Sequence, residues 1–251
     1  MKVKQLVVIN LCDDFKSPAD LNKPHQMLED RQVAFGLFSK HAGRGDGTAP
    51  KAAWWIEVDN TAATGDAAEL KPDMHYRLVK SSAGDLATFD TNERDVGVYI
   101  IYHGKKSSDP NIFGVTPMGK ADNKKVQAKR LVGVLEKLKV RPIRKLSLVA
   151  CHSDSQKSAA GKNFLVAVGE QLQAWGGDRP MIAGYDDYVT ASWKDGHKVA
   201  GDEKAKGTTH KHVWVYRSGM LGSGYKSVAL EQSGWSDKNN LPTNTGVAAV
   251  F

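Results

Sequence analysis

The sequence predicts an α/β fold in three layers, with a mostly parallel central sheet between two layers of helices. Six short runs of apolar and β-branched residues recur along the chain, and several are apolar at consecutive positions, as in strands that are covered on both faces. Two amphipathic segments separate the third, fourth and fifth runs. The resulting order of strand, helix, strand, helix and strand across 96–185 is typical of a parallel sheet.

The expected strands are, in order, 5–11, 52–58, 96–102, 145–151, 180–185 and 212–217. The first expected helix, 123–139, places its apolar residues on one face and its lysines on the other. The second, 159–175, is followed by Gly176-Gly177, a common stop signal for a helix. The core sheet is therefore expected within about 5–185.

The pattern changes after Tyr188, where strand-like pieces are separated by polar residues. Asp195-Gly196 is a hairpin signal, so we expect an antiparallel flap over about 188–217. The tail, about 232–251, predicts no regular element. We expect a single domain spanning 1–251, because the chain has no internal repeat and enough apolar residues for one large core.

The composition is that of an ordinary soluble globular protein, with 41% apolar and 25% charged residues. No run approaches the ~18 consecutive apolar residues of a membrane helix. The early run LVVINL is too short for a cleavable signal peptide and is followed by two aspartates. We therefore expect no membrane span, and either a cytoplasmic protein or one delivered by a specialised secretion system.

The net charge of +7 is concentrated between Lys120 and Lys145, where ten basic and two acidic residues give +8. Such a segment can bind phosphates, nucleic acid or an acidic surface. Exposed helix faces are commonly rich in lysine, however. We interpret the segment as a solvated helix face and do not expect nucleic acid as a partner.

The two cysteines, Cys12 and Cys151, are too few for a disulfide scaffold and form no Cys-x-x-Cys pair for zinc. A single disulfide bond between them remains an open alternative, but sparse cysteines are more commonly reduced thiols. The pair Cys151-His152 has no second pair of ligands elsewhere in the sequence, so we expect no metal site.

Two of the expected strands end on residues that can perform chemistry. VGVYIIY is followed by His103-Gly104, and LSLVA is followed by Cys151. Parallel strands joined by one crossover helix end at the same edge of the sheet, so His103 and Cys151 are expected to face each other although they are 48 residues apart. A base beside a thiol generates the thiolate and later protonates a leaving amine. The N–H groups of Gly104 and Cys151 are the expected oxyanion donors.

These residues resemble the caspase-fold cysteine peptidases of clan CD, in which one strand ends in His-Gly and the next in Ala-Cys. The resemblance covers about 96–185, and the gap of 48 residues is similar to the roughly 50 of caspases. Cys151 is followed by His152-Ser153-Asp154 and not by the Arg-Gly of caspases. The chain is thus closer in character to clostripain-like peptidases and to the self-processing domains of bacterial toxins and effectors.

The resemblance implies a caspase-like fold and a single-chain cysteine endopeptidase acting on a protein or peptide substrate. Cys151 would be the nucleophile and His103 the general base and acid. The loop that follows the strand after the nucleophile would help to form the S1 pocket. Acidic residues there predict Arg or Lys at P1, and aromatic residues predict an apolar P1 instead. The acidic candidates are Asp186 and Asp187 in this loop and Asp154 shortly after Cys151, and the aromatic ones are Tyr185, Tyr188 and Trp193.

The resemblance to toxin domains also implies an activator, because a basic flap in those domains can bind inositol hexakisphosphate. No cofactor is expected to be required. The basic residues of the expected flap are Lys194, Lys198, Lys204, Lys206, Lys211 and Arg217, of which Lys204, Lys206 and Lys211 are the candidate ligands. His210 and His212 alternate along a strand and are interpreted as surface residues.

Two other functions remain open at the level of the sequence. One is a non-enzymatic basic α/β module that binds phosphorylated ligands or nucleic acid through 120–145. The other keeps the dyad but transfers the acyl group to an amine, which makes a peptide ligase. The oligomeric state is not predicted by any pattern in the sequence.

Overall fold

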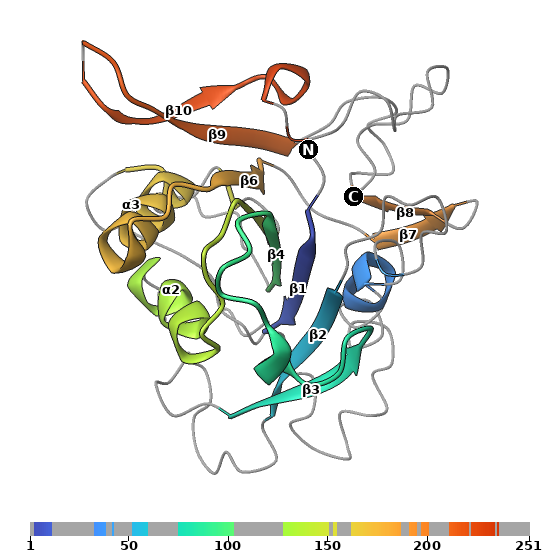
Figure 1. Cartoon of the computed structure of the whole chain (residues 1–251). Helices are drawn as coiled ribbons and strands as arrows, with labels where there is room; N and C mark the ends of the chain where they lie inside the picture. Colours follow the sequence, from blue (N-terminus) through green and yellow to red (C-terminus); the bar gives the residue numbers. More distant parts are fainter. Residues whose placement is uncertain are drawn as a thin grey trace, which may run out of the picture.

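The structure is a computed structural model, and its secondary structure is arranged in three layers. α2 and α3 cover one face of a central sheet, and a helical segment at 33–38 lies on the other side (Figure 1). The described residues are 3–11, 33–38, 42, 52–59, 75–102, 128–150, 153–154, 162–186, 191–194, 197–200, 211–220, 222–233 and 235. The predicted α/β class with a mostly parallel central sheet is confirmed.

In the described part of the chain, eight strands form the main sheet, in the order β10-β9-β6-β5-β4-β1-β2-β3. They are β1 Gln5–Asn10, β2 Ala52–Asp59, β3 His75–Ser81, β4 Val96–Ile101, β5 Lys145–Val149, β6 Met181–Tyr185, β9 Lys211–Arg217 and β10 Gly224–Val228. β2, β1, β4, β5 and β6 pair in parallel, whereas β3, β9 and β10 pair antiparallel with their neighbours. The five parallel strands therefore end at a common carboxyl edge.

The boundaries of α3 are explained by the chemistry of the residues that flank it. α3 (Phe164–Gly176) begins after Asn163, whose side chain caps two helix N–H groups, and ends at Gly177 with φ of 75°. The predicted start at 159 was therefore too early, because Lys162 and Asn163 precede the helix. α2 spans Ala128–Lys137, within the predicted 123–139. The described residues also include the short 3-10 helices η2 (Leu86–Thr88) and η3 (Leu230–Gln232).

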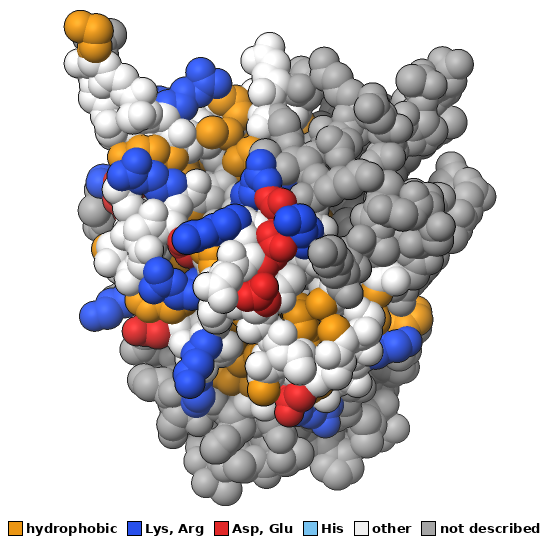
Figure 2. Space-filling model, in the orientation of Figure 1, with side chains coloured by type: hydrophobic (Ala, Val, Ile, Leu, Met, Phe, Trp, Pro, Cys, Tyr) orange, Lys and Arg blue, Asp and Glu red, His pale blue; other side chains and the backbone are white. Residues whose placement is uncertain are grey.

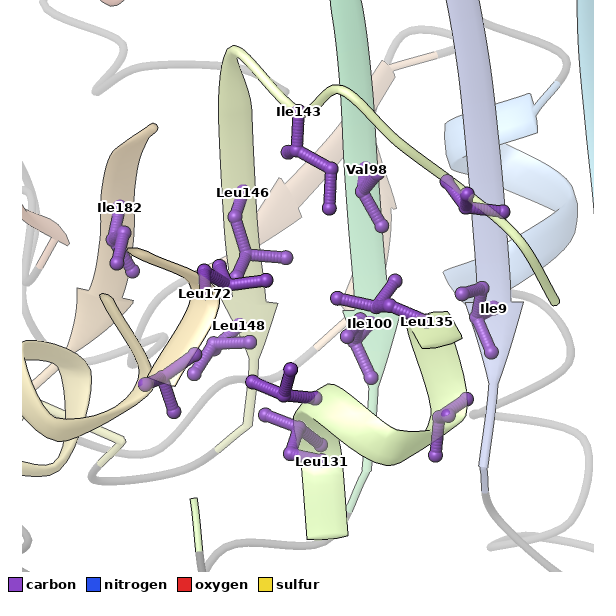
Figure 3. Packing of buried hydrophobic residues seen from close by; sticks show 14 of the residues in the cluster. Ile9, Val98, Ile100, Leu131, Leu135, Ile143, Leu146, Leu148, Leu172 and Ile182 are labelled. Carbon is purple, nitrogen blue, oxygen red and sulfur yellow. The ribbon is translucent and has the colours of Figure 1, made fainter. Parts of the chain in front are cut away.

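The largest core lies between the sheet and the pair α2 and α3 (Figure 3). Leu131 and Leu135 of α2 pack on Ile100 and Leu148, and Leu172 of α3 lies in the same cluster. Side chains alternate between the faces of a strand, so the even residues of β5 face these helices. Burial of a leucine or isoleucine stabilises a fold by about 1.5–3 kcal/mol, and this cluster holds the strands around the candidate site in register.

The opposite face is covered by two separate clusters. At the β1 and β2 end, the helical segment at 33–38 packs Leu37 and Phe38 onto the sheet. At the β6 and β9 end, Met181, Ala183 and Val213 lie under Trp235. The sheet is thus buried on both faces, which explains why its strands are apolar at consecutive positions.

The antiparallel part of the structure differs in one respect from the prediction. β7 (Ala191–Lys194) and β8 (His197–Ala200) form a separate two-stranded sheet on either side of Asp195-Gly196, as the hairpin signal predicts. The expected flap extended to 217, but Lys211–Arg217 is β9 and pairs with β6 in the main sheet. In the described part of the chain, no helix is long and apolar enough to cross a membrane.

Candidate active site

The two strands that precede the candidate catalytic residues are neighbours at the carboxyl edge. β4 and β5 pair in parallel with Ile101 opposite Val149, and the Tyr102 N–H donates to the Val149 carbonyl at 3.3 Å. Tyr102 and Ala150 are both buried. The chain therefore leaves the sheet from two adjacent positions, as the sequence predicts.

The next residue of the chain after Tyr102 is His103, and the next after Ala150 is Cys151. His103, Gly104 and Cys151 lie outside the described residues, so their predicted roles stay predictions. Burial raises the pKa of the Tyr102 hydroxyl well above its usual range. The residue before His103 is therefore a neutral phenol at physiological pH.

Ser153 fixes the chain on the far side of positions 151 and 152. Its side chain is fully buried, its hydroxyl donates to the Leu148 carbonyl at 3.1 Å, and it accepts the Tyr185 N–H at 2.9 Å. The Ser153 N–H in turn reaches the Ala150 carbonyl at 3.4 Å. One hydroxyl thus ties β5, the turn after it and β6 together.

Gly184 leaves the room that Ser153 needs. A Cβ at this glycine would lie 2.8 Å from the Ser153 Oγ and 2.7 Å from a Leu165 methyl group. Both distances are shorter than real side chains tolerate. A glycine in β6 is therefore required by the close approach of the turn and of α3.

Asp154 is held by side chains from two other elements. Its Oδ1 accepts the Trp214 Nε1–H at 2.6 Å and an N–H of the Asn163 amide at 3.1 Å. Its backbone N–H donates to the Tyr185 carbonyl at 2.8 Å, and its carbonyl accepts from the Asn163 amide at 2.5 Å. The Asn163 Oδ1 caps the N–H of Leu165 at 2.9 Å, so the same residue starts α3 and fixes Asp154.

His212 lies between two of the predicted substrate-binding aspartates. Its Nε2 is 3.0 Å from the Asp186 Oδ2, and its Nδ1 is 3.4 Å from the Asp154 Oδ2. Only the doubly protonated imidazolium can donate to both carboxylates. The interpretation of His212 as a plain surface residue was therefore incomplete, although its side chain is 41% exposed. The useful signal was His212 and Trp214 two residues apart, which places them on one face of a strand.

The remaining predicted site residues are placed as follows. Asp187, Lys204 and Lys206 lie outside the described residues, as do His210 and Tyr188, and for Trp193 the structure describes the backbone of β7 alone. Tyr185 is buried in the cluster beneath the 33–38 segment, so it does not line an open apolar pocket. Burial raises the pKa of its hydroxyl well above its usual range.

Lys211 is not the exposed flap residue that an activator site requires. It begins β9, it is 6% exposed, and its Nζ lies 4.4 Å from the centroid of the Trp235 ring. A buried ammonium over an indole is held by a cation–π interaction. Among the described residues, no group of three or more His, Cys, Asp or Glu side chains could hold a metal ion.

Several basic residues of the 120–145 segment are engaged within the protein. Arg144 pairs with Asp95, Arg141 stacks on Trp175, and the Lys145 Nζ donates to the Trp235 carbonyl at 2.5 Å. On the face that Figure 2 shows, Lys and Arg side chains are separated by neutral and acidic ones. Arg141, Arg144 and Lys145 are thus engaged within the protein, while 120–127 lie outside the described residues.

Comparisons with known proteins add little to this geometry. No protein-family model matches the sequence, and no curated protein matches it. Among solved structures, the chain is similar to the X-ray structure of a secreted C11 cysteine protease from Bacteroides thetaiotaomicron, iotapain, with 10% identity and a TM-score of 0.34. The match covers 79% of this chain and 55% of the protease, so the chain spans about half the length of that protein. At this TM-score the likeness carries no argument about the activity of the chain.

Proposed function

We propose that the protein is a cysteine endopeptidase in which Cys151 is the nucleophile and His103 is the general base and acid. One observation carries this proposal. β4 and β5 are adjacent and parallel, with Ile101 opposite Val149, and each leads within two residues to one member of the dyad. A thiol and an imidazole that follow neighbouring strand ends are placed for proton transfer between them.

The chemistry follows from that pairing. His103 takes the proton of the Cys151 thiol, and the thiolate attacks the carbonyl carbon of the scissile peptide. The C–N bond then breaks while His103 gives the proton to the leaving amine, which leaves a thioester on Cys151. Water, deprotonated by His103, hydrolyses the thioester and restores the thiol. The N–H groups of Gly104 and Cys151 are the proposed donors to the oxyanion.

Asp186 supports a basic residue at P1. It follows β6 directly, its side chain is 40% exposed, and β6 is the strand next to that of the nucleophile. A carboxylate at this edge attracts the side chain of Arg or Lys. Asp187 belongs to the same proposal, and Tyr188 and Trp193 remain the candidates for an apolar pocket.

An irreversible thiol-directed inhibitor tests the dyad. We expect it to label Cys151 at least about tenfold faster than Cys12, because a neighbouring base raises the thiolate fraction. Cleavage of Arg-terminated fluorogenic peptides should be lost in step with this labelling. Equal labelling of the two cysteines, or full cleavage after Cys151 is labelled, would contradict the proposal.

The P1 preference is tested with paired substrates. Arg-terminated peptides should outperform Leu- and Asp-terminated ones, and the double substitution Asp186→Asn and Asp187→Asn should remove that preference. A preference that survives the double substitution would exclude both residues from the pocket. Mass analysis of the products with an added amine separates hydrolysis from ligation, since a ligase would return the amide.

A further inference from the structure

Asp154 and Asp186 share one imidazole but differ in exposure. The Asp154 side chain is 10% exposed and that of Asp186 is 40% exposed, although His212 contacts both. Both were candidates for binding a substrate cation. The difference in exposure divides them into an inner and an outer carboxylate.

The inner carboxylate, that of Asp154, already has hydrogen-bond and ionic partners within the protein. Its Oδ1 receives two hydrogen bonds, from Trp214 of β9 and from Asn163 at the start of α3, and its Oδ2 faces His212. Hydrogen bonds to a charged acceptor are stronger than those between neutral groups. A substrate cation would have to displace these partners before it could reach Asp154.

Asp154 lies close in sequence to the proposed nucleophile, so its contacts bear on the position of that residue. The residue lies three positions after Cys151, and its backbone is bonded to Tyr185 of β6 and to Asn163. Ala150 on the near side and Ser153 on the far side are buried. The contacts of Asp154 therefore hold in place a point of the chain that is three residues from Cys151.

We propose that Asp154 is a positioning residue that holds the turn of Cys151 through Trp214 and Asn163, while Asp186 is the carboxylate on the same imidazole that meets the substrate. The proposal rests on the peptidase function proposed above. His212 then connects Asp154, near the nucleophile, to Asp186 in the proposed substrate pocket. The positioning role of Asp154 is not visible in the sequence, where Asp154 and Trp214 are 60 residues apart.

The two carboxylates are expected to affect different kinetic constants. Loss of Asp154 disturbs the direction of the thiol and lowers kcat for every peptide, and a misplacement of about 1 Å can cost 100-fold in rate. Loss of Asp186 weakens binding of a basic P1 residue and raises KM for Arg peptides alone. A purely structural role for Asp154 predicts less folded protein but unchanged kcat per folded molecule.

The experiment compares Asp154→Ala and Asp154→Asn with Asp186→Asn, using Arg and Leu peptides and active-site titration. Asp154→Ala should lower kcat about 100-fold for both peptides with KM changed less than about twofold. Asp154→Asn keeps an oxygen for Trp214 and Asn163, so it should stay within about tenfold of the wild-type kcat. Trp214→Phe removes a single donor and should show a smaller loss in the same direction.

Asp178→Ala is the matched control, because Asp178 is a similarly buried aspartate at the opposite edge of the sheet. It should lower the melting temperature without changing kcat. If Asp154→Ala behaves like this control, with normal kcat per folded molecule, the positioning role is wrong.

A second readout is independent of peptide cleavage. Alkylation of Cys151 by iodoacetamide should be about tenfold slower in Asp154→Ala, while alkylation of Cys12 is unchanged. An unchanged or faster rate at Cys151 overturns the proposal. If the wild-type protein cleaves no peptide, the proposed function fails, and alkylation alone decides on Asp154.

Discussion

The amino and carboxyl ends of the parallel strands are held by different kinds of contact. At the amino ends, Arg144 pairs with Asp95, and the Lys4 Nζ lies 3.3 Å from a Glu93 oxygen, with partly exposed side chains throughout. Exposed ion pairs contribute about 0–1 kcal/mol each. At the carboxyl ends, Ser153 and Asp154 are joined by buried or half-buried hydrogen bonds to β5, β6, β9 and the start of α3.

The difference shows where the fold tolerates change. Independent surface pairs can be lost one at a time. In a linked network, removing one member leaves buried polar partners unsatisfied, at a cost of about 1–3 kcal/mol each. The carboxyl end is therefore the rigid end, which suits a site that must hold reacting groups in place.

The largest expected effect is on activity at the carboxyl end. Cys151→Ala and His103→Ala should each lower peptide cleavage by several orders of magnitude with the fold intact, because loss of a nucleophile or its base removes the whole mechanism. Cys12→Ala should be nearly silent, because the proposed mechanism gives that thiol no role. Comparable cleavage by the Cys151 variant would end the peptidase proposal.

The next largest effect is a loss of stability when one of two closely packed glycines, Gly184 and Gly176, is replaced by alanine. Gly184→Ala should cost about 1–3 kcal/mol, because the new methyl group meets Leu165 and the fixed Ser153 hydroxyl. At the amino end, a Cβ on Gly176 meets the Arg141 guanidinium at 2.7 Å, and this flexible group can move away. Gly176→Ala should therefore cost less than about 1 kcal/mol. Urea unfolding measures both, and equal losses would refute the contrast in rigidity.

A smaller effect concerns Asp178 at the amino end, whose carboxylate accepts the Ile143 N–H at 3.1 Å. Burial raises the pKa of Asp178, against the opposing effects of that hydrogen bond and of Arg141 and Arg94. The folded state thus binds this proton more tightly, and its contribution to stability falls as pH rises from about 4. Asp178→Asn should remove this loss of stability. The melting temperature of the variant, relative to that of the wild type, should therefore rise between pH 4 and neutrality. Parallel pH profiles for the two proteins would show that the shift is absent.

The smallest expected effect is that of a polyanion. We expect inositol hexakisphosphate to raise the melting temperature and the cleavage rate if it binds the competent state. Charge reversal of Lys204 and Lys206 should abolish this response, and charge reversal of Lys129 on α2 should not. Lys211 is left out because its ammonium is buried on Trp235. Activity that is full without the anion, and no thermal shift with it, would assign these lysines to solvation.

The sequence predicted the interior of this fold better than its edges. β1, β4, β5 and β6 are recognisable because strands buried on both faces are apolar at consecutive positions. β3 and β10 were missed, since HYRLVKS and GYKSV carry the charged residues that are typical of edge strands. The placement of β9 in the flap was also wrong, because the residue pattern of a strand does not show which strand it pairs with.

The candidate site divides in the same way. The ends of β4 and β5 were predictable, because one crossover helix between parallel strands places them at one edge. The contacts of Asp154 were not, since Trp214 lies 60 residues away and His212 lies 26 residues from Asp186. These contacts depend on β9 pairing with β6, which the sequence did not reveal.

Trp235 has a consequence for trimming of the chain by proteases. Its carbonyl accepts from Lys145, its ring lies beneath the Lys211 ammonium, and both lysines are buried. Digestion from the carboxyl terminus that stops after Trp235 keeps the indole over Met181, Ala183 and Val213. Digestion past it strips an apolar surface and removes a partner of two buried cations, so a product shortened beyond this residue should precipitate where the longer one stays in solution.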